Sequence, residues 1–329
     1  MTIQNRIDRA SRVSLEELLK ALPGGFNAIA DIKERRNTVD SLLRMMIAEL
    51  PPIENVVMED RNIPGPDGSP EVGVRIYKPV DVSGSLPGMF FIHGGGMIMG
   101  FIEGENLKAA MLCETIQAVV VSVEYRLAPE NPHPAPVQDC YEALVWMSKN
   151  ATELGFDPER LAIVGGSAGG GLAIATALMA RDQEFPKLCF QMANYPMIDD
   201  RNETPSSKEI TNVGIWDREA NLEAWDWYLG GKPADEYAAP ARAKNLSDLP
   251  PTFIDVGEID LFRDEDIEFA TRLLQAGVTT ELHVYPGAYH ASEAFAPDAE
   301  LSKQIWAKRI EALETSLENL TVLRYQIEG

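Results

Sequence analysis

Residues 161–171 read LAIVGGSAGGG, and this run decides the fold. Its first four residues are apolar and typical of a buried strand, whereas residues 168–181 have the composition of a helix. Between the two lies a Gly-x-Ser-x-Gly pentapeptide made by Gly165, Ser167 and Gly169. A serine at a sharp strand-to-helix turn presents its hydroxyl outward, and small residues on either side relieve the crowding of the backbone. The run therefore predicts a nucleophile elbow at Ser167.

Two other interpretations of this glycine-rich run are a turn that only lets a helix pack closely on a strand and a loop that binds phosphate. The dinucleotide pattern G-x-G-x-x-G cannot be placed on residues 165–171, and the Gly-Lys-Ser/Thr ending of a P-loop is missing from the sequence. A helix that starts after Ser167 would instead direct free N–H groups and the positive end of its dipole at an oxyanion beside the serine. The pentapeptide alone occurs by chance, so the prediction needs partner residues elsewhere.

Composition bounds the class of protein. The 329 residues, of which 45% are hydrophobic, can bury a large core, and we expect one α/β domain with a cap. The formal net charge of -22 repels nucleic acid and anionic membranes. Cys113, Cys140 and Cys189 lack C-x-x-C spacing, which favours buried thiols over disulfides or a zinc site. Without a signal peptide or a run of about 18 apolar residues, we expect a soluble cytoplasmic protein that inserts into no membrane.

The order of the segments predicts an α/β fold. Apolar residues recur at helical spacing in the first fifty residues, which predicts two amphipathic helices followed by Pro51 and Pro52. Strand-like runs at 56–61 and 72–77, separated by IPGPDGSP, predict a hairpin at a sheet edge. The alternation that follows predicts β-α units and a parallel sheet. Its strands are expected at 88–92, 118–123, 161–164, 188–194, 252–256 and 281–285, and its helices at 105–117, 137–150, 168–181, 264–276 and 299–317.

Residues 197–237 interrupt this alternation with turn formers and aromatic side chains. We expect the segment to leave the sheet layer and to form a lid with the N-terminal helices; an aromatic cluster that only packs into the core is the alternative. Trp216 and Trp225 are expected to line an apolar substrate pocket. The predicted division of the chain is N-terminal cap helices at 1–50, a first part of the core at 51–196, a cap insertion at 197–237, a second part of the core at 238–320 and a C-terminal tail at 321–329.

The search for a general base is short because the chain has only four histidines. In the chain order of hydrolases with a serine elbow, the base follows both the serine and the acid, which leaves His283 and His290. Reacting groups of open α/β sheets lie beyond the carboxyl ends of the strands, where His290 falls. His283 lies within the strand-like ELHVY and would project from a sheet face. His290 is therefore the predicted base.

The carboxylate that orients the base is expected in the loop after the strand at 252–256, which reads GEIDLFRDED. Acids from residue 264 onward are expected to start the next helix, where capping and the helix dipole favour them. Asp260 is the predicted acid, and Glu258 is the reserve candidate.

The run HGGG at residues 93–96 follows directly on the strand-like MFFI. Three consecutive glycines let backbone N–H groups approach a substrate closely, as an oxyanion hole requires. Metal binding by His93 is the weaker interpretation, because no second ligand lies at a suitable spacing, and we expect no metal.

Five motifs occur in one order along the chain, and together they resemble the hormone-sensitive-lipase-like carboxylesterases (bacterial family IV) of the α/β-hydrolase superfamily. The similarity covers roughly residues 70–315. The motifs are HGGG at 93–96, VSVEYRLAPENPHPAPVQD at 121–139, GGSAGG at 165–170, DLPPTFIDVGEIDLFRDE at 248–265, and His290.

This resemblance implies roles for individual residues. Matched by motif, Ser167 is similar to the family's nucleophile, Asp260 to its acid and His290 to its base. The residues that donate to the oxyanion are then Gly95, Gly96 and Ala168.

The resemblance also implies an eight-stranded, mostly parallel sheet with helices on both faces and a helical cap. It implies hydrolysis of short-acyl carboxylic esters, small-molecule substrates, no cofactor, and homodimers as a common assembly. Two positions depart from the family pattern. Gly166 stands where the family usually has aspartate or threonine, and Ala291 and Ser292 follow the histidine where glycine and an aromatic residue are frequent.

Two further functions share these motifs. An amidase or carbamate hydrolase would use the same catalytic parts, and the sequence does not separate it from an esterase. A small-ligand receptor is the other, because plant gibberellin receptors resemble the same fold with the catalytic base lost. This chain retains His290, which favours turnover.

Overall fold

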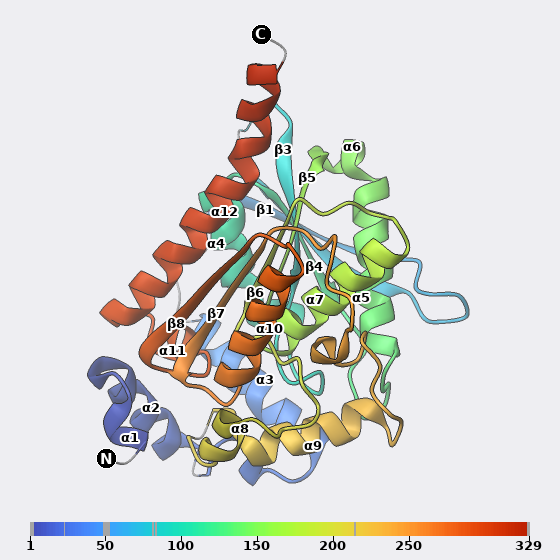
Figure 1. The fold of residues 1–329 in the computed structure, drawn as a ribbon. Coiled ribbons are helices and arrows are strands. Elements are labelled where there is room, and N and C mark those ends of the chain that lie inside the picture. Colours follow the sequence, from blue (N-terminus) through green and yellow to red (C-terminus); the bar gives the residue numbers. More distant parts are fainter. Residues whose placement is uncertain are drawn as a thin grey trace.

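The computed structural model describes residues 3–22, 24–48, 53–80, 82, 84–213 and 215–327. Its centre is one eight-stranded sheet with helices on both faces (Figure 1). In their order across the sheet the strands are β1 (Val56–Ile63), β2 (Val72–Pro79), β4 (Val119–Glu124), β3 (Leu86–Ile92), β5 (Phe156–Gly166), β6 (Phe190–Asn194), β7 (Thr252–Ile259) and β8 (Thr280–Tyr289). The two pairings of β2 are antiparallel and the other five are parallel, which confirms the predicted mostly parallel sheet.

The strands differ from the sequence prediction mainly in length. β1 and β2 form the hairpin expected at the sheet edge. β5 begins at Phe156, although only residues 161–164 read as a strand, because Asp157 and Pro158 are typical of turns. The register with β3 shifts at this point, so a bulge absorbs the irregular residues. β8 reaches Tyr289 and thereby delivers the next residue, His290, directly from the strand end.

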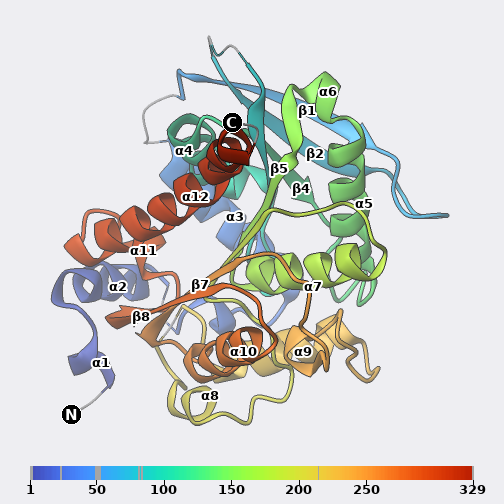
Figure 2. The same ribbon diagram turned by 45° about the horizontal axis from the view of Figure 1, so that its top comes forward.

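Helices cover both faces of the sheet (Figures 1 and 2). α4 (Asn106–Ile116) and α12 (Glu300–Ile327) lie on one face, and α5 (Ala135–Lys149), α7 (Ala168–Asp182) and α10 (Arg263–Gln275) on the other. Each face buries its own apolar cluster, as expected for strands that alternate between two covered faces. The remaining helical segments are α1 (Ile3–Arg6), α2 (Arg9–Ala21), η1 (Phe26–Ala28), α3 (Ile32–Ala48), η2 (Ile102–Glu105), α6 (Ala151–Leu154), α8 (Pro205–Glu209), α9 (Arg218–Leu229), η3 (Pro240–Arg242) and α11 (Ser292–Phe295).

Two predicted boundaries involve residues at the margins of the structure. Pro51 and Pro52, expected after the N-terminal helices, lie outside the described residues. α12 was expected to end at residue 317 but continues to Ile327, because no proline or glycine interrupts the sequence there. Residues 321–327 of the predicted tail thus extend this helix, and Glu328 and Gly329 are outside the described range.

The N-terminal helices and the insertion meet at the end of the sheet where the parallel strands finish, and Figure 1 shows α1, α2, α8 and α9 together there. Arg35 of α3, which is 1% exposed, donates to Glu223 of α9 at 2.5 Å. Arg36 donates to the carbonyl oxygens of Ile98 and Ala128, both at 2.6 Å. These contacts fix the N-terminal helices to the insertion and to the loops that follow β3 and β4.

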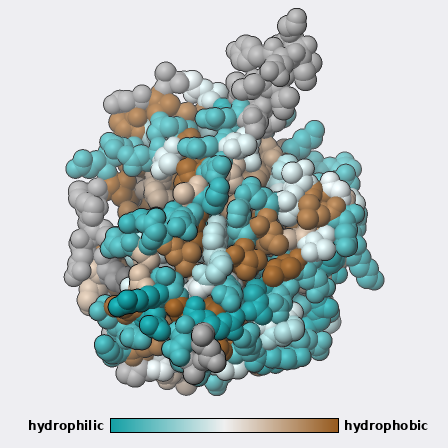
Figure 3. Space-filling view, turned by 60° about the vertical axis from the view of Figure 1, so that its left-hand side comes forward, coloured by the Kyte–Doolittle hydropathy of each residue, from teal (hydrophilic) through white to brown (hydrophobic). Residues whose placement is uncertain are grey.

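The outer surface is largely hydrophilic on the face that lies to the left in Figure 1, as the space-filling view in Figure 3 shows. Smaller hydrophobic patches lie between the polar side chains on this face. Within the described ranges, no helix combines the length and the hydropathy needed to cross a membrane.

Candidate active site

Ser167 occupies the corner between β5 and α7. Its backbone has φ 58° and ψ −124°, a combination that residues other than glycine rarely adopt. Three backbone hydrogen bonds hold it there: its N–H donates to Asn194 at 2.9 Å, and its carbonyl accepts from Gly171 and Met197 at 3.0 Å each. Such strain persists only where the surrounding structure fixes it, and it is typical of functional sites.

Two glycines make this corner sterically feasible. A methyl group at Gly165 would come within 2.1 Å of the carbonyl oxygen of Gly169. One at Gly169 would come within 2.2 Å of the carbonyl oxygen of Ile92. Both positions therefore require glycine because of the close approach of backbone atoms.

The structure brings Ser167, His290 and Asp260 into one hydrogen-bonded row. Ser167 Oγ lies 2.9 Å from His290 Nε2, and His290 Nδ1 lies 2.8 Å from Asp260 Oδ2. The other carboxylate oxygen of Asp260 accepts from the Phe262 N–H at 3.0 Å, which fixes its orientation. Asp260 is fully buried and the serine and histidine are nearly so, at 9% and 5% exposed. Low exposure strengthens the electrostatic coupling along the row.

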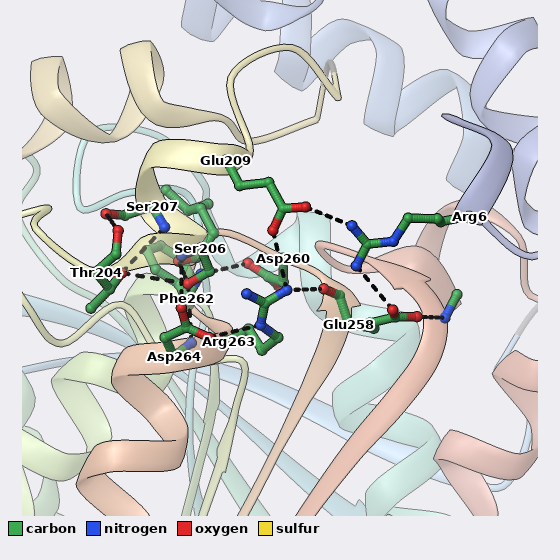
Figure 4. A network of polar contacts seen from close by, with 12 residues as sticks. Arg6, Thr204, Ser206, Ser207, Glu209, Glu258, Asp260, Phe262, Arg263 and Asp264 are labelled. Atoms are coloured by element: carbon green, nitrogen blue, oxygen red, sulfur yellow. Dashed lines mark hydrogen bonds and ion pairs between the residues drawn. The ribbon is translucent and has the colours of Figure 1, made fainter. Parts of the chain in front are cut away.

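Glu258, the reserve candidate for the acid, is engaged elsewhere (Figure 4). One of its carboxylate oxygens accepts from Arg6 at 2.9 Å and the other from the Gly287 N–H at 3.0 Å. The hydrogen bond from Arg6 lowers the pKa of the Glu258 carboxyl. Glu258 thus joins the N-terminal segment to the strand end that precedes His290.

Arg6 extends this network from the core to the insertion (Figure 4). It also donates to Glu209 of α8 at 2.5 Å. Beside it, Ser206 of α8 donates its hydroxyl to the Leu261 carbonyl at 2.9 Å and its backbone N–H to Asp264 at 2.7 Å. The loop that carries Asp260 is therefore held by polar contacts from α1 and α8, two segments far apart in the sequence.

The HGGG loop lies beside the serine. A methyl group at Gly94 would be 3.5 Å from Ser167 Cβ, so the loop borders the elbow. Gly95 and Gly96 have φ 112° and φ 64°, and at Gly95 a side chain would meet the Met99 carbonyl oxygen at 2.3 Å. Ala168, buried at the first position of α7, follows the serine. Gly95, Gly96 and Ala168, the predicted oxyanion donors, thus belong to the glycine loop beside the serine and to the first turn of α7.

His93 is buried in a structural setting. It is 2% exposed, stacks on Tyr125 at 4.2 Å between ring centroids, and donates through Nδ1 to the Gly94 carbonyl at 2.8 Å. Burial lowers the pKa of its imidazole, so the ring is neutral. It therefore fixes the start of the glycine loop.

The two tryptophans expected in the substrate pocket have different surroundings. Trp216 lies directly on the HGGG loop: a methyl group at Gly96 would be 2.2 Å from its ring. Its Nε1 donates to Asn221 at 3.0 Å. Trp225 lies on α9, is 2% exposed, and packs at 5.9 Å between ring centroids against Tyr228. The first faces the candidate oxyanion donors, whereas the second packs among buried residues of the insertion.

The sequence analysis did not single out Tyr195, which packs edge to face on His290 at 4.9 Å between ring centroids. Its only sequence signal is its position directly after β6, the strand that pairs with β5. This position lies at the carboxyl edge of the sheet. Phe262 makes a second such contact with the imidazole at 5.2 Å.

Comparison with known proteins agrees with this geometry. Residues 89–294 match a protein-family model described as alpha/beta hydrolase fold. The chain is 35% identical over 311 residues to carboxylesterase NlhH of Mycobacterium tuberculosis, covering 92% of this chain and 95% of that protein. Esterase LipI of the same species is 37% identical over 231 residues, with 68% and 71% covered. A solved structure titled Bacterial Heroin Esterase superposes with a TM-score of 0.89 at 39% identity, covering 96% of this chain and 99% of that one.

Proposed function

Because the chain belongs to the alpha/beta hydrolase fold family and is a carboxylesterase of its hormone-sensitive-lipase-like branch, we propose that it cleaves short-chain carboxylic esters through an acyl-enzyme on Ser167. One observation carries the proposal: the row from Ser167 Oγ to His290 Nε2 at 2.9 Å and from His290 Nδ1 to Asp260 at 2.8 Å. These are the contacts that general-base activation of a serine requires.

In the first half of the reaction, His290 Nε2 takes the hydroxyl proton as Ser167 Oγ attacks the ester carbonyl carbon. Asp260 accepts the Nδ1–H hydrogen bond, which sets the imidazole tautomer and stabilises the imidazolium. The tetrahedral intermediate then expels the alcohol, which receives the proton from His290 Nε2. The acyl group remains as an ester of Ser167.

The oxyanion of the intermediate is stabilised by backbone N–H groups of Gly95, Gly96 and Ala168. The place of the glycine loop beside the serine and the start of α7 at Ala168 support this assignment. Loss of one such donor costs about 3 kcal/mol of transition-state stabilisation in comparable sites. In the second half of the reaction, water attacks the acyl-enzyme with His290 as base, which releases the acid and restores the serine.

Trp216 limits the acyl side of the pocket in this proposal, because its ring closes on Gly96. A short acyl group fits beneath it, whereas a long chain must displace the ring. Trp225 lies on the insertion helix α9 itself and, buried against Tyr228, is assigned to the packing that supports this pocket. Both side chains belong to the segment that we assign as cap insertion, residues 197–237.

We assign residues 1–50 as the second part of this cap and residues 51–196 and 238–320 as the hydrolase core, whose last helix continues into residues 321–327 of the predicted tail. The ion pairs of Arg6 and Arg35 with the insertion support the pairing of the two cap segments. The described cysteines are free thiols, as a reducing cytoplasm requires, and this supports a cytoplasmic enzyme.

An organophosphate and p-nitrophenyl esters test the proposal. Mass spectrometry should find the phosphoryl adduct on Ser167 of the wild type, and Ser167→Ala should lose at least about 10³-fold in hydrolysis of p-nitrophenyl acetate and butyrate. An adduct on another residue, or equal rates for the two proteins, would contradict the mechanism. Faster turnover of the matched anilide than of the ester would assign an amidase instead.

A further inference from the structure

A cluster of buried charges lies behind His290, outside the row of catalytic contacts. Arg309 of α12 donates to Asp255 of β7 through Nε at 2.8 Å and Nη2 at 3.1 Å. Its Nη1 donates to Glu293 of α11 at 2.7 Å. All three side chains are at most 2% exposed. Burial of charges costs free energy even when they are paired, so stability alone does not explain the cluster.

Tyr195 connects this cluster to the imidazole. Its hydroxyl donates to Glu293 Oε1 at 2.7 Å, the same oxygen that accepts from Arg309. Its ring packs on His290 with an angle of 68° between the ring planes. The contacts thus run without a gap from α12 through Glu293 and Tyr195 to the predicted base.

The backbone of Tyr195 is held in an unusual conformation. Its φ is 36°, in the left-handed region that a residue with a bulky side chain rarely occupies. Its N–H donates to the Asp255 carbonyl at 2.6 Å, and the neighbouring Asn194 amide donates to the Asp255 carboxylate at 3.1 Å. Asn194 in turn accepts the N–H of Ser167. The cluster therefore fixes the serine corner and the histidine contact together.

We propose that Glu293 and Arg309 are positioning residues for ester hydrolysis, which hold the Tyr195 ring against His290 and so set the angle between Nε2 and Ser167 Oγ. This inference rests on the proposed function. Glu293 lies three residues after His290, so its bond to Arg309 also fixes the loop that carries the base to α12. A displacement of a catalytic group by about 1 Å lowers the rate without removing any reacting atom.

The charge state of Glu293 suits this role. Burial by itself would raise the pKa of its carboxyl. The Arg309 guanidinium and the Tyr195 hydroxyl act in the opposite direction, and the resulting pKa is lowered to about 2. Glu293 is therefore ionised at neutral pH. The groups that face the imidazole directly are Asp260, Ser167, Phe262 and the Tyr195 ring. Of these, the Tyr195 ring connects the imidazole to Glu293 and Arg309, and we call this connection the tether.

Tyr195→Phe removes only the hydroxyl and keeps the ring and all three charges. We expect kcat for p-nitrophenyl butyrate to fall about fivefold, the equivalent of one hydrogen bond, with KM changed less than about twofold. Tyr289→Phe is the matched control, because it removes a buried hydroxyl from the residue that precedes His290. This hydroxyl donates to the Ser11 carbonyl at 3.4 Å and not to Glu293. Its kcat should equal that of the wild type.

A second pair of variants tests Glu293. Glu293→Gln keeps an oxygen that can accept from Tyr195 and should retain more activity than Glu293→Ala. Tyr195→Phe combined with Glu293→Ala should lose no more kcat than Glu293→Ala alone, because both changes break one tether. All rates are taken per Ser167 labelled by organophosphate, so a fraction of misfolded protein does not enter them.

The outcomes separate this inference from the proposed function. If Tyr195→Phe keeps the wild-type kcat, or if kcat of the double variant falls by the product of the two single losses, the tether is refuted, while labelling of Ser167 still supports the mechanism. If the wild type is neither labelled nor active, the proposed function itself fails. If the cluster is only structural, the Glu293 variants should have a lower unfolding midpoint and an unchanged kcat per labelled site.

Discussion

The Trp216 ring lies against Gly96 so closely that a methyl group added to this glycine would meet it at 2.2 Å. A side chain of the insertion therefore closes the space above the predicted oxyanion donors. Because Trp216 is 5% exposed, the ring belongs to the wall of the site and not to the outer surface. We therefore expect the Trp216 side chain to set the acyl preference.

Trp216→Ala should admit longer acyl chains, because removal of the ring opens the space next to Gly96. We expect the ratio of kcat/KM for decanoate to that for acetate to rise about tenfold or more, measured on a series of p-nitrophenyl esters. Trp227→Ala is the control, since this tryptophan of the same segment packs under Arg35 at 5.6 Å from its ring centroid. An unchanged ratio in Trp216→Ala would place the acyl pocket elsewhere.

Asp260→Asn should lower kcat by about 10⁴-fold, because the amide favours the wrong imidazole tautomer. Glu258→Gln should keep most of the wild-type kcat, since Glu258 contacts Arg6 and Gly287 and not the imidazole. Steady-state rates of both variants at neutral pH decide between the two carboxylates. The reverse ranking would make Glu258 the acid.

Gly166→Ala should be tolerated, because the added methyl group would lie 3.4 Å from Tyr195 Cε2, an ordinary contact. Gly165→Ala should cost about 3 kcal/mol or more of the free energy of unfolding, because its methyl group would meet a backbone oxygen at 2.1 Å. Urea unfolding of the two purified variants measures this difference. Equal stabilities would show that the elbow has more room than its geometry indicates.

The stability of the protein should depend on pH through Glu124. Burial raises the pKa of this carboxyl from 4.5 to about 7, although the Ile102 N–H that it accepts at 2.8 Å opposes the shift. The unfolded chain therefore releases this proton at lower pH than the folded protein, and the contribution to stability is lost as pH rises from about 4.5 to about 7.

Glu124→Gln should flatten this part of the stability profile, because the amide is neutral at every pH and can still accept from Ile102. Urea midpoints measured across the same pH range test it, with Glu314→Gln on the exposed face of α12 as control. A flat wild-type profile, or a fall in stability with rising pH that is equal in Glu124→Gln and Glu314→Gln, would contradict the assignment to Glu124.

Local motifs in the sequence predicted the fold and the three side chains that the structure places in one row. The corner at Ser167 could be predicted because it depends only on neighbouring residues, among them Gly165 and Gly169. The chain order of the parallel strands places Asp260 and His290 at the same edge of the sheet. Such rules favour neither Asp260 nor Glu258, because both follow the strand expected at 252–256; in the structure Glu258 still belongs to β7 and Asp260 follows its end. Contacts with Arg6, more than two hundred residues away along the chain, account for Glu258.

The parts that sequence analysis missed depend on contacts between distant segments. Nothing near Arg309 indicates that it reaches Asp255 and Glu293, because an arginine on an amphipathic helix is usually solvated. Ala291 is a different case: it has φ 56°, in the left-handed region where glycine is the more favourable residue.

The order of these residues along the chain has a consequence for biosynthesis. Translation produces the serine corner first, while Asp260, His290 and the arginine of α12 leave the ribosome only later. A nascent chain whose first β-α units have already folded therefore carries an alcohol without a base, and it cannot acylate itself on cellular esters. In the proposed mechanism hydrolysis can begin only after Asp260 and His290 have joined the sheet, so folding of the first units and the onset of chemistry are separate events in time.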